Sequence, residues 1–131
     1  MDTLKPGFKG TAELTVAREH CTSRGGPWVF MTPAMVQFCE MSCHSMVMPK
    51  LNAGQHTVGT VVNIRHLAPT PEGMKVRAEM ELLEVDRRRL KFKVQIFDEV
   101  ELVGECEHER FVIDIATAGG RIQKKIDAMK R

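Results

Sequence analysis

The chain has 131 residues, of which 43% are apolar and 27% charged, and its formal net charge is +2. This length and composition predict a single folded domain over residues 1–131 with one hydrophobic core. The small net charge excludes any argument for a nucleic-acid partner on electrostatic grounds. No apolar run is long enough to cross a membrane, and the first residues lack the apolar segment of a secretory signal. We therefore expect a cytoplasmic protein with no membrane partner.

The first predicted element is a half-buried strand over residues 8–16. Apolar residues and glycine alternate there with polar residues, as they do in a strand that covers a core with one face. Residues 18–27 are rich in turn formers, among them Gly25, Gly26 and Pro27, and predict a loop.

The only long helix is predicted over residues 33–48. Thr32 is expected to cap its first turn through the side-chain hydroxyl, Pro33 suits the first helical position, and Pro49 marks the end. At 100° per residue most of the helix surface is apolar, so we expect the rest of the chain to wrap around it. Glu40 lies on the border between the broad apolar face and the opposite side.

Four further strands are predicted over residues 56–67, 74–82, 89–98 and 100–115, joined mostly by short turns. In the first of them Val58, Thr60, Val62, Ile64 and His66 are expected to share the inner face. The alternation slips after Leu82, which predicts a bulge or the strand's end near a turn at 86–88.

The last of these strands turns Cys106, His108 and Arg110 inward, where a histidine and an arginine need partners or a ligand. Residues 118–130 predict a short, basic, amphipathic C-terminal helix. A strand, a long helix and four strands joined by tight turns predict an α+β protein whose mainly antiparallel, curved sheet wraps around one helix, the hotdog fold.

The four cysteines are expected to be packed thiols in a reducing compartment rather than disulfides. Cys39 and Cys43 lie four residues apart, beside His44, and a metal site there is the alternative. Because no second pair of ligands stands at zinc-site spacing, we expect no metal.

Three polar residues fall at positions where the pattern predicts restricted solvent, namely Thr32, Glu40 and His66. Each has an ordinary structural explanation: a helix cap, a carboxylate that reaches water and a hydrogen-bonded strand histidine. Thr32 and Glu40 are about 12 Å apart along a helix axis at 1.5 Å per residue. A single site would therefore need a third group or a second subunit.

The segments VFMTPAMVQFCE, GTVVNIRHLAPTPEG and EHERFVI closely resemble the fluoroacetyl-CoA thioesterase family of hotdog proteins. That family carries a Thr, a Glu eight residues later and a His a further 26 residues on, and Thr32, Glu40 and His66 match both intervals without a gap. The resemblance runs from about Val29 to Ile113.

This resemblance implies hydrolysis of an acyl-CoA thioester by a homodimer, with no cofactor other than the coenzyme A of the substrate. It implies that Glu40 attacks the carbonyl or activates water, that His66 relays a proton, and that Thr32 orients the carboxylate or the substrate. Gly59 matches the position whose backbone N–H stabilises the developing oxyanion, and Arg110 matches an arginine near the acyl end of the pocket.

One segment departs from the family pattern. The fluoroacetate-specialised member has an aromatic lid before the helix, whereas this chain reads SRGGPW, with Gly26 at the position of a lid phenylalanine. The departure predicts a short acyl group other than fluoroacetyl. Trp28 is expected either to pack in the core or to act as a lid. The alternative function is a non-catalytic protein that binds acyl-CoA or an acyl carrier.

Overall fold

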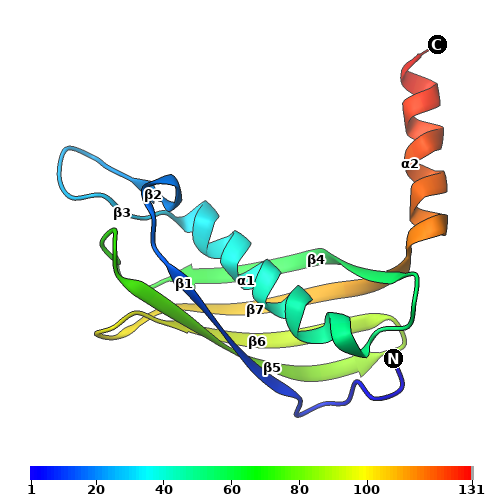
Figure 1. Cartoon of the computed structure of the whole chain (residues 1–131), viewed down its shortest axis with the longest axis horizontal. Helices are drawn as coiled ribbons and strands as arrows, with labels where there is room; N and C mark the ends of the chain where they lie inside the picture. The colour runs from blue at the N-terminus through cyan, green and yellow to red at the C-terminus, as the bar shows by residue number, and fades with distance from the viewer. Residues whose placement is uncertain (131) are drawn as a thin grey trace.

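The computed structural model describes residues 1–130 (Figure 1). It contains seven strands and two α-helices: β1 (Lys9–Thr15), β2 (Cys21–Thr22), β3 (Val29–Phe30), α1 (Thr32–Val47), β4 (Gln55–His66), β5 (Lys75–Asp86), β6 (Arg89–Phe97), β7 (Leu102–Asp114) and α2 (Ile115–Met129). Two short 3-10 helices cover Arg18–His20 and Met48–Lys50.

Five strands form one antiparallel sheet in the order β1-β5-β6-β7-β4, and α1 lies along its concave face (Figure 1). This arrangement confirms the predicted hotdog fold. β1 and β4 are the two edge strands, and β2 and β3 pair separately as a short ribbon before α1.

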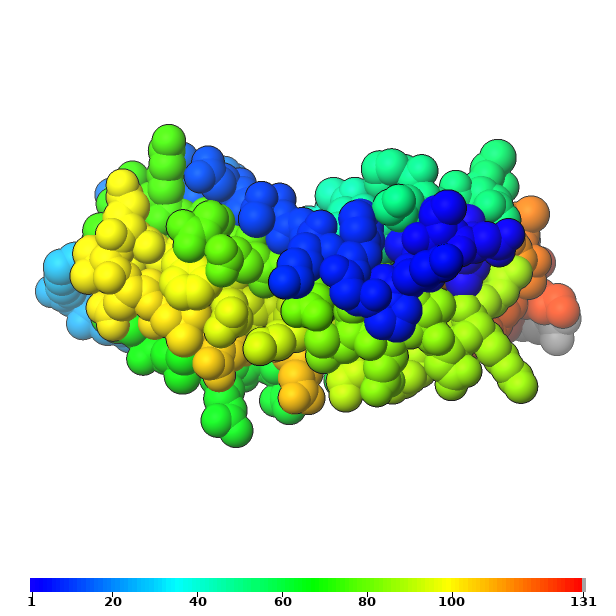
Figure 2. All heavy atoms as spheres, turned by 90° about the horizontal axis from the view of Figure 1, so that it is seen from below, coloured from blue at the N-terminus to red at the C-terminus, as the bar shows by residue number. Residues whose placement is uncertain are grey.

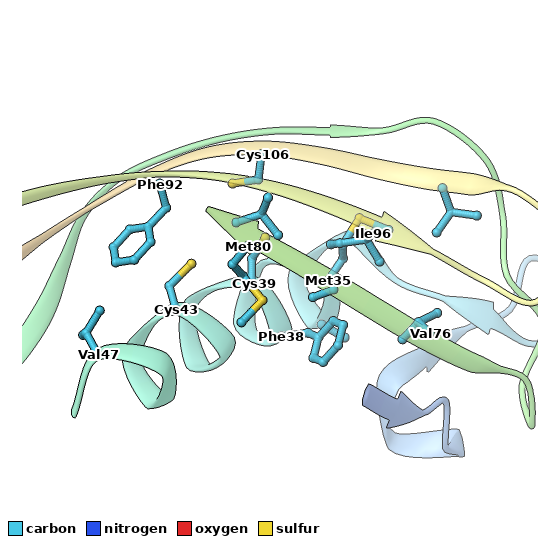
Figure 3. Packing of buried hydrophobic residues seen from close by; sticks show 14 of the residues in the cluster. Met35, Phe38, Cys39, Cys43, Val47, Val76, Met80, Phe92, Ile96 and Cys106 are labelled. Atoms are coloured by element: carbon cyan, nitrogen blue, oxygen red, sulfur yellow. The ribbon is translucent and has the colours of Figure 1, made fainter. Parts of the chain in front are cut away.

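The core lies between α1 and the inward residues of the sheet. The alternation in β6 is regular, with Leu90, Phe92, Val94 and Ile96 almost fully buried. From α1 the core receives residues spaced four apart, as Figure 3 shows: Met35, Cys39, Cys43 and Val47. All four cysteines are buried and free, which confirms that they are packed thiols.

The N-terminal residues close one edge of this core. Figure 2 shows them beside β5 and the end of α1, where Leu4 is buried. The terminal ammonium group donates a hydrogen bond to Oδ1 of Asn52 (3.0 Å), and the Gly7 N–H donates to the Leu82 carbonyl (2.8 Å).

The start of α1 differs from the prediction. Met31 is the N-cap, Thr32 is the first helical residue, and no side chain caps the first turn. The Thr32 hydroxyl is free of the helix because it lies against His66 instead. The residues predicted as a plain loop over 18–27 also contain a 3-10 turn and β2.

β4 shows the largest difference from the sequence prediction. The register with β7 shifts between Gly59 and Val61, so that Thr60 is an extra residue. A bulge of this kind reverses the alternation on one side of it. Consequently Val58 is 40% exposed and Thr57, predicted to face outward, is 2% exposed. The predicted bulge after Leu82 is present between Leu82 and Glu84.

α2 follows β7 directly and starts at Ile115, three residues before the predicted helix. The prediction continued the preceding strand to Ile115, which is why it missed the first turn of α2. α2 has no buried residue, and it projects away from the sheet (Figure 1). Within residues 1–130, neither helix has the length and apolarity needed to cross a membrane.

Candidate active site

The first of two polar clusters lies at the start of α1 and the end of β4. Oγ1 of Thr32 and Nδ1 of His66 are 2.8 Å apart, within hydrogen-bond distance. Burial lowers the pKa of His66 below its ordinary value, because the charged ring loses water there. Its other nitrogen, Nε2, is buried and has no hydrogen-bond partner among residues 1–130. A neutral imidazole with one nitrogen held and the other unoccupied can give or take a proton.

The second cluster lies two turns further along α1. The Glu40 carboxylate faces Gly59 on β4 so closely that its Oε2 occupies the space where a Cβ of residue 59 would stand. The same oxygen is 3.7 Å from Nη1 of Arg110 on β7. The Glu40 side chain is 36% exposed, whereas that of Arg110 is 7% exposed. The carboxylate is therefore held between a glycine and a buried cation, with one side open to solvent.

The guanidinium of Arg110 is fixed by hydrogen bonds to three residues. Nε donates to Oγ1 of Thr57 (2.8 Å) and Nη2 donates to the Thr57 carbonyl (3.1 Å). Nη1 donates to Nε2 of His108 (3.1 Å) and to the Glu40 carbonyl (3.4 Å). Burial lowers the pKa of Arg110, and the facing Glu40 carboxylate opposes this effect. Because an arginine remains protonated, the cluster keeps one permanent positive charge.

The neighbours of His108 decide which of its nitrogens carries the proton. Nδ1 lies 2.7 Å from the Val61 carbonyl, which can only accept, so Nδ1 carries the hydrogen. Nε2 faces the Arg110 guanidinium, which can only donate, so Nε2 presents its lone pair. Burial also lowers the pKa of His108. This imidazole is neutral and serves as an acceptor for Arg110.

The five predicted site residues thus fall into two groups. Thr32 meets His66, and Glu40 meets Gly59 and Arg110. Within one chain the groups remain about 12 Å apart along α1, eight residues at 1.5 Å each. Thr32 is exposed in the single chain, although the pattern predicted restricted solvent there.

Two residues of the second cluster were not predicted as site residues. His108 was expected to face inward and need a partner, and that partner is Arg110. Thr57 could not be found from the pattern, because the alternation of β4 points it outward unless the bulge at Thr60 is known. The same bulge turns Gly59 toward Glu40.

The segment before α1, where the sequence comparison predicted no aromatic lid, is held by contacts of Arg18 with Trp28 and Glu72. The Arg18 guanidinium lies 4.3 Å from the centre of the Trp28 ring and makes a two-point ion pair with Glu72, with both hydrogen bonds at 3.0 Å. Trp28 is 38% exposed and is therefore not a core residue. A cation stacked on the indole and held by a carboxylate limits the motion of this tryptophan.

Comparisons with known proteins identify the family of the chain. The family of fluoroacetyl-CoA-specific thioesterases, FlK, matches residues 11–116. The fluoroacetyl-CoA thioesterase of Streptantibioticus cattleyicolor is 35% identical over 102 residues, which cover 78% of this chain and 73% of that protein.

Solved structures show the same relationship. A structure of the fluoroacetyl-CoA thioesterase FlK is 30% identical, has a TM-score of 0.88, and the match covers 95% of this chain and 98% of FlK. A variant of FlK has been solved with fluoroacetate and CoA; it is 31% identical, with a TM-score of 0.81 over 87% of this chain and 98% of the variant. A Thermus thermophilus thioesterase superfamily member shares the fold at 23% identity, with a TM-score of 0.91 over 99% and 98% of the two chains. The chain therefore belongs to the FlK family of acyl-CoA thioesterases, within the hotdog-fold superfamily.

Proposed function

We propose that this chain hydrolyses the thioester of a short acyl-CoA and that Glu40 is the catalytic carboxylate. The observation that carries the proposal is the position of the Glu40 carboxylate, which fills the side-chain space of Gly59 and faces the buried Arg110 at the border of the core. A carboxylate held at the border of a core by a single cation has the surroundings of a catalytic group.

The proposed reaction uses the residues of both clusters. Glu40 either attacks the thioester carbonyl, giving a transient anhydride that water opens, or removes a proton from the attacking water. The carbonyl oxygen becomes negative and is stabilised by the backbone N–H of Gly59, where the missing side chain permits close approach. The C–S bond breaks, and the departing thiolate receives, by way of His66, the proton that the attacking water gives up, while Thr32 orients the imidazole. Arg110 lies at the acyl end of the pocket.

These steps need both clusters in one place, and we propose that a second copy of the chain supplies one of them. β4 is an edge strand, so its outer N–H and C=O groups are available for pairing with another strand. If two β4 strands pair antiparallel about an axis between Val62 and Asn63, Gly59 of one chain lies opposite His66 of the other. The exposed Thr32 would then approach the Glu40 of the other subunit.

The acyl group that we propose is short and is not restricted to fluoroacetyl. Relatives in this family act on fluoroacetyl-CoA, and one FlK variant has been solved with acetyl-CoA. In this chain, however, the lid position is Gly26, and the adjoining Trp28 is held by Arg18. Gly26 has no side chain that could contact a fluorinated carbon as a lid phenylalanine would. The Trp28 ring is held against Arg18 and does not replace that contact.

A hydrolysis screen tests the proposal. Release of free thiol is measured with acetyl-, fluoroacetyl-, branched and aromatic acyl-CoAs for the wild type, Glu40→Gln and His66→Ala. Glu107→Gln is the matched control, because Glu107 is exposed on the outer face of the same sheet. We expect rapid turnover of one or more short acyl-CoAs, lost in the first two variants and kept in the control.

Four results would contradict parts of this proposal. Full activity of Glu40→Gln would remove the site assignment, and the absence of turnover with every acyl-CoA would favour the binding function. Rapid cleavage of fluoroacetyl-CoA alone would refute the proposed breadth. A monomeric mass in light scattering at the enzyme concentration of the assay would refute the shared site.

A further inference from the structure

The Arg110 cluster continues beyond the groups used in the proposed reaction. Oγ1 of Thr57, which accepts a hydrogen bond from Nε of Arg110, also lies 2.7 Å from Nδ1 of His44 on α1. Thr57 is 2% exposed, and His44 is partly exposed at the end of the same chain of contacts. A continuous path of hydrogen bonds therefore runs from the edge of the helix to the cation that faces Glu40.

The direction of each hydrogen bond follows from the chemistry of the groups. An arginine Nε–H can only donate, so Oγ1 of Thr57 must accept from it. The hydroxyl proton of Thr57 then needs an acceptor of its own, and among residues 1–130 the nitrogen of His44 is the group within reach. His44 must present a lone pair at Nδ1 and carry its hydrogen at Nε2. Had His44 donated instead, the buried hydroxyl proton would have no partner.

We infer that His44 and Thr57 are positioning residues, which orient the guanidinium of Arg110 toward Glu40. Thr57 contacts Arg110 twice, through its hydroxyl and its backbone carbonyl, so it fixes the plane of the guanidinium. His44 fixes the rotation of the Thr57 hydroxyl. On the opposite side His108, in the other neutral tautomer, holds Nη1. The two histidines thus support one cation from two sides, with opposite nitrogens carrying the hydrogen.

This inference rests on the proposed function for its effect on catalysis, whereas its hydrogen-bond pattern is independent of it. Two-dimensional 15N–1H NMR of the ring nitrogens tests the pattern in the wild-type protein at neutral to mildly alkaline pH. We expect His44 in the Nε2–H form and His108 in the Nδ1–H form. An Nδ1–H form of His44, or its rapid exchange between tautomers, would overturn the inference whether or not the protein hydrolyses thioesters.

Steady-state kinetics tests the positioning role. Thr57→Val keeps the shape of the side chain and removes the hydroxyl, and we expect it to lower kcat by about 10- to 100-fold, the range for a lost hydrogen bond to a charged group. KM is expected to change by less than about threefold, because the displaced carboxylate acts on the reacting carbonyl and does not hold coenzyme A. Thr57→Ser restores the hydroxyl and should recover most of kcat.

Variants of His44 test the hydrogen bond between His44 and the Thr57 hydroxyl. His44→Leu removes the acceptor and should lower kcat by several-fold, whereas His44→Asn places an oxygen where Nδ1 stands and should recover it. Thr11→Val on the outer face of β1 is the matched control for a lost strand hydroxyl. An unchanged kcat in Thr57→Val, or a loss that only matches the unfolded fraction in a thermal melt, would refute the positioning role. A wild type without thioesterase activity would instead refute the proposed function and leave the tautomer result standing.

Discussion

The contact between Glu40 and Gly59 makes Gly59→Ala an informative substitution. An added Cβ would overlap Oε2 of Glu40 and would lie 3.3 Å from Nη1 of Arg110 and 3.4 Å from Cε1 of His108. The two buried neighbours are held by hydrogen bonds, so the overlap is relieved by the flexible end of the Glu40 side chain. The carboxylate must turn toward the solvent, away from Arg110.

The stability change is expected to be small. Alanine in place of glycine within a strand contributes about 0.5–1 kcal/mol through the unfolded chain. The ion pair that is lost is partly exposed and contributes less than about 1 kcal/mol. The two terms nearly cancel, so we expect the melting temperature to stay within about 4 °C of the wild type.

The activity change is expected to be large. Moving a catalytic carboxylate by more than 1 Å costs about 100-fold in rate or more, so we expect kcat/KM for the preferred acyl-CoA to fall by at least that factor. Gly10→Ala is the matched control, because Gly10 lies on β1, the edge strand opposite to β4. Its added Cβ would lie 2.8 Å from Sδ of Met46, which is part of a flexible side chain and can move away. We expect that variant to keep its activity.

A double-mutant cycle separates displacement of Glu40 from other effects. In the Glu40→Ala background the added methyl of Gly59→Ala meets no carboxylate, so we expect no further loss of activity. The reasoning would be refuted if Gly59→Ala kept kcat/KM near the wild-type value, or if it lowered the residual activity of Glu40→Ala as strongly as that of the wild type.

Three further predictions concern the first cluster, the buried histidine and α2. Thr32→Ala removes the hydrogen-bond partner of Nδ1 of His66, so kcat should fall by about 10-fold, as for a lost hydrogen bond. Thr32→Ser keeps the hydroxyl and should recover kcat. Equal activity of the two variants would exclude an orienting role for Thr32. Because burial lowers the pKa of His108 below 6.5, the folded state takes up fewer protons than the unfolded state, so stability is full above pH 6.5 and falls as the pH drops toward the folded pKa. Chemical denaturation at several pH values should show this fall, and it should be shallower in His108→Gln; an equal slope in both proteins would contradict the neutral assignment. Since α2 has no buried residue, truncation after Thr117 should change the melting temperature by less than about 4 °C, and a larger loss would mean that α2 packs against another copy of the chain.

Much of the fold could be predicted because most strands alternate without interruption. In β6 and β7 every second residue is buried, as the alternation of apolar and polar residues in the sequence predicts. The helix was predictable from its proline boundaries and its broad apolar face. The early start of α2 was not, because Ile115 continues the pattern of β7 in the sequence, and the hydrogen bond from its N–H to the Gly54 carbonyl is a long-range contact.

The candidate site was predictable only in part, for two physical reasons. The intervals shared with the thioesterase family selected Thr32, Glu40 and His66 as a set, but they do not reveal that one chain brings Thr32 to His66 and leaves Glu40 with Gly59. Thr57 escaped because a bulge changes which residues face inward without changing the composition of the strand. The inward orientation of His108 and Arg110 was predicted, and in the structure the two side chains are hydrogen-bond partners of each other.

The inserted residue in β4 allows two residues at an odd separation, Gly59 and His66, to share the inner face of the strand. The stretch before Thr60 presents odd-numbered residues to the helix, and the stretch after Val61 presents even-numbered ones. Deletion of Thr60 would restore simple alternation and leave both Gly59 and His66 facing inward, because their separation would fall from seven residues to six. Point substitutions in the exposed positions nearby should be tolerated, and deletion of Thr60 should keep the pairing of β4 with β7 as well as the inward orientation of both residues.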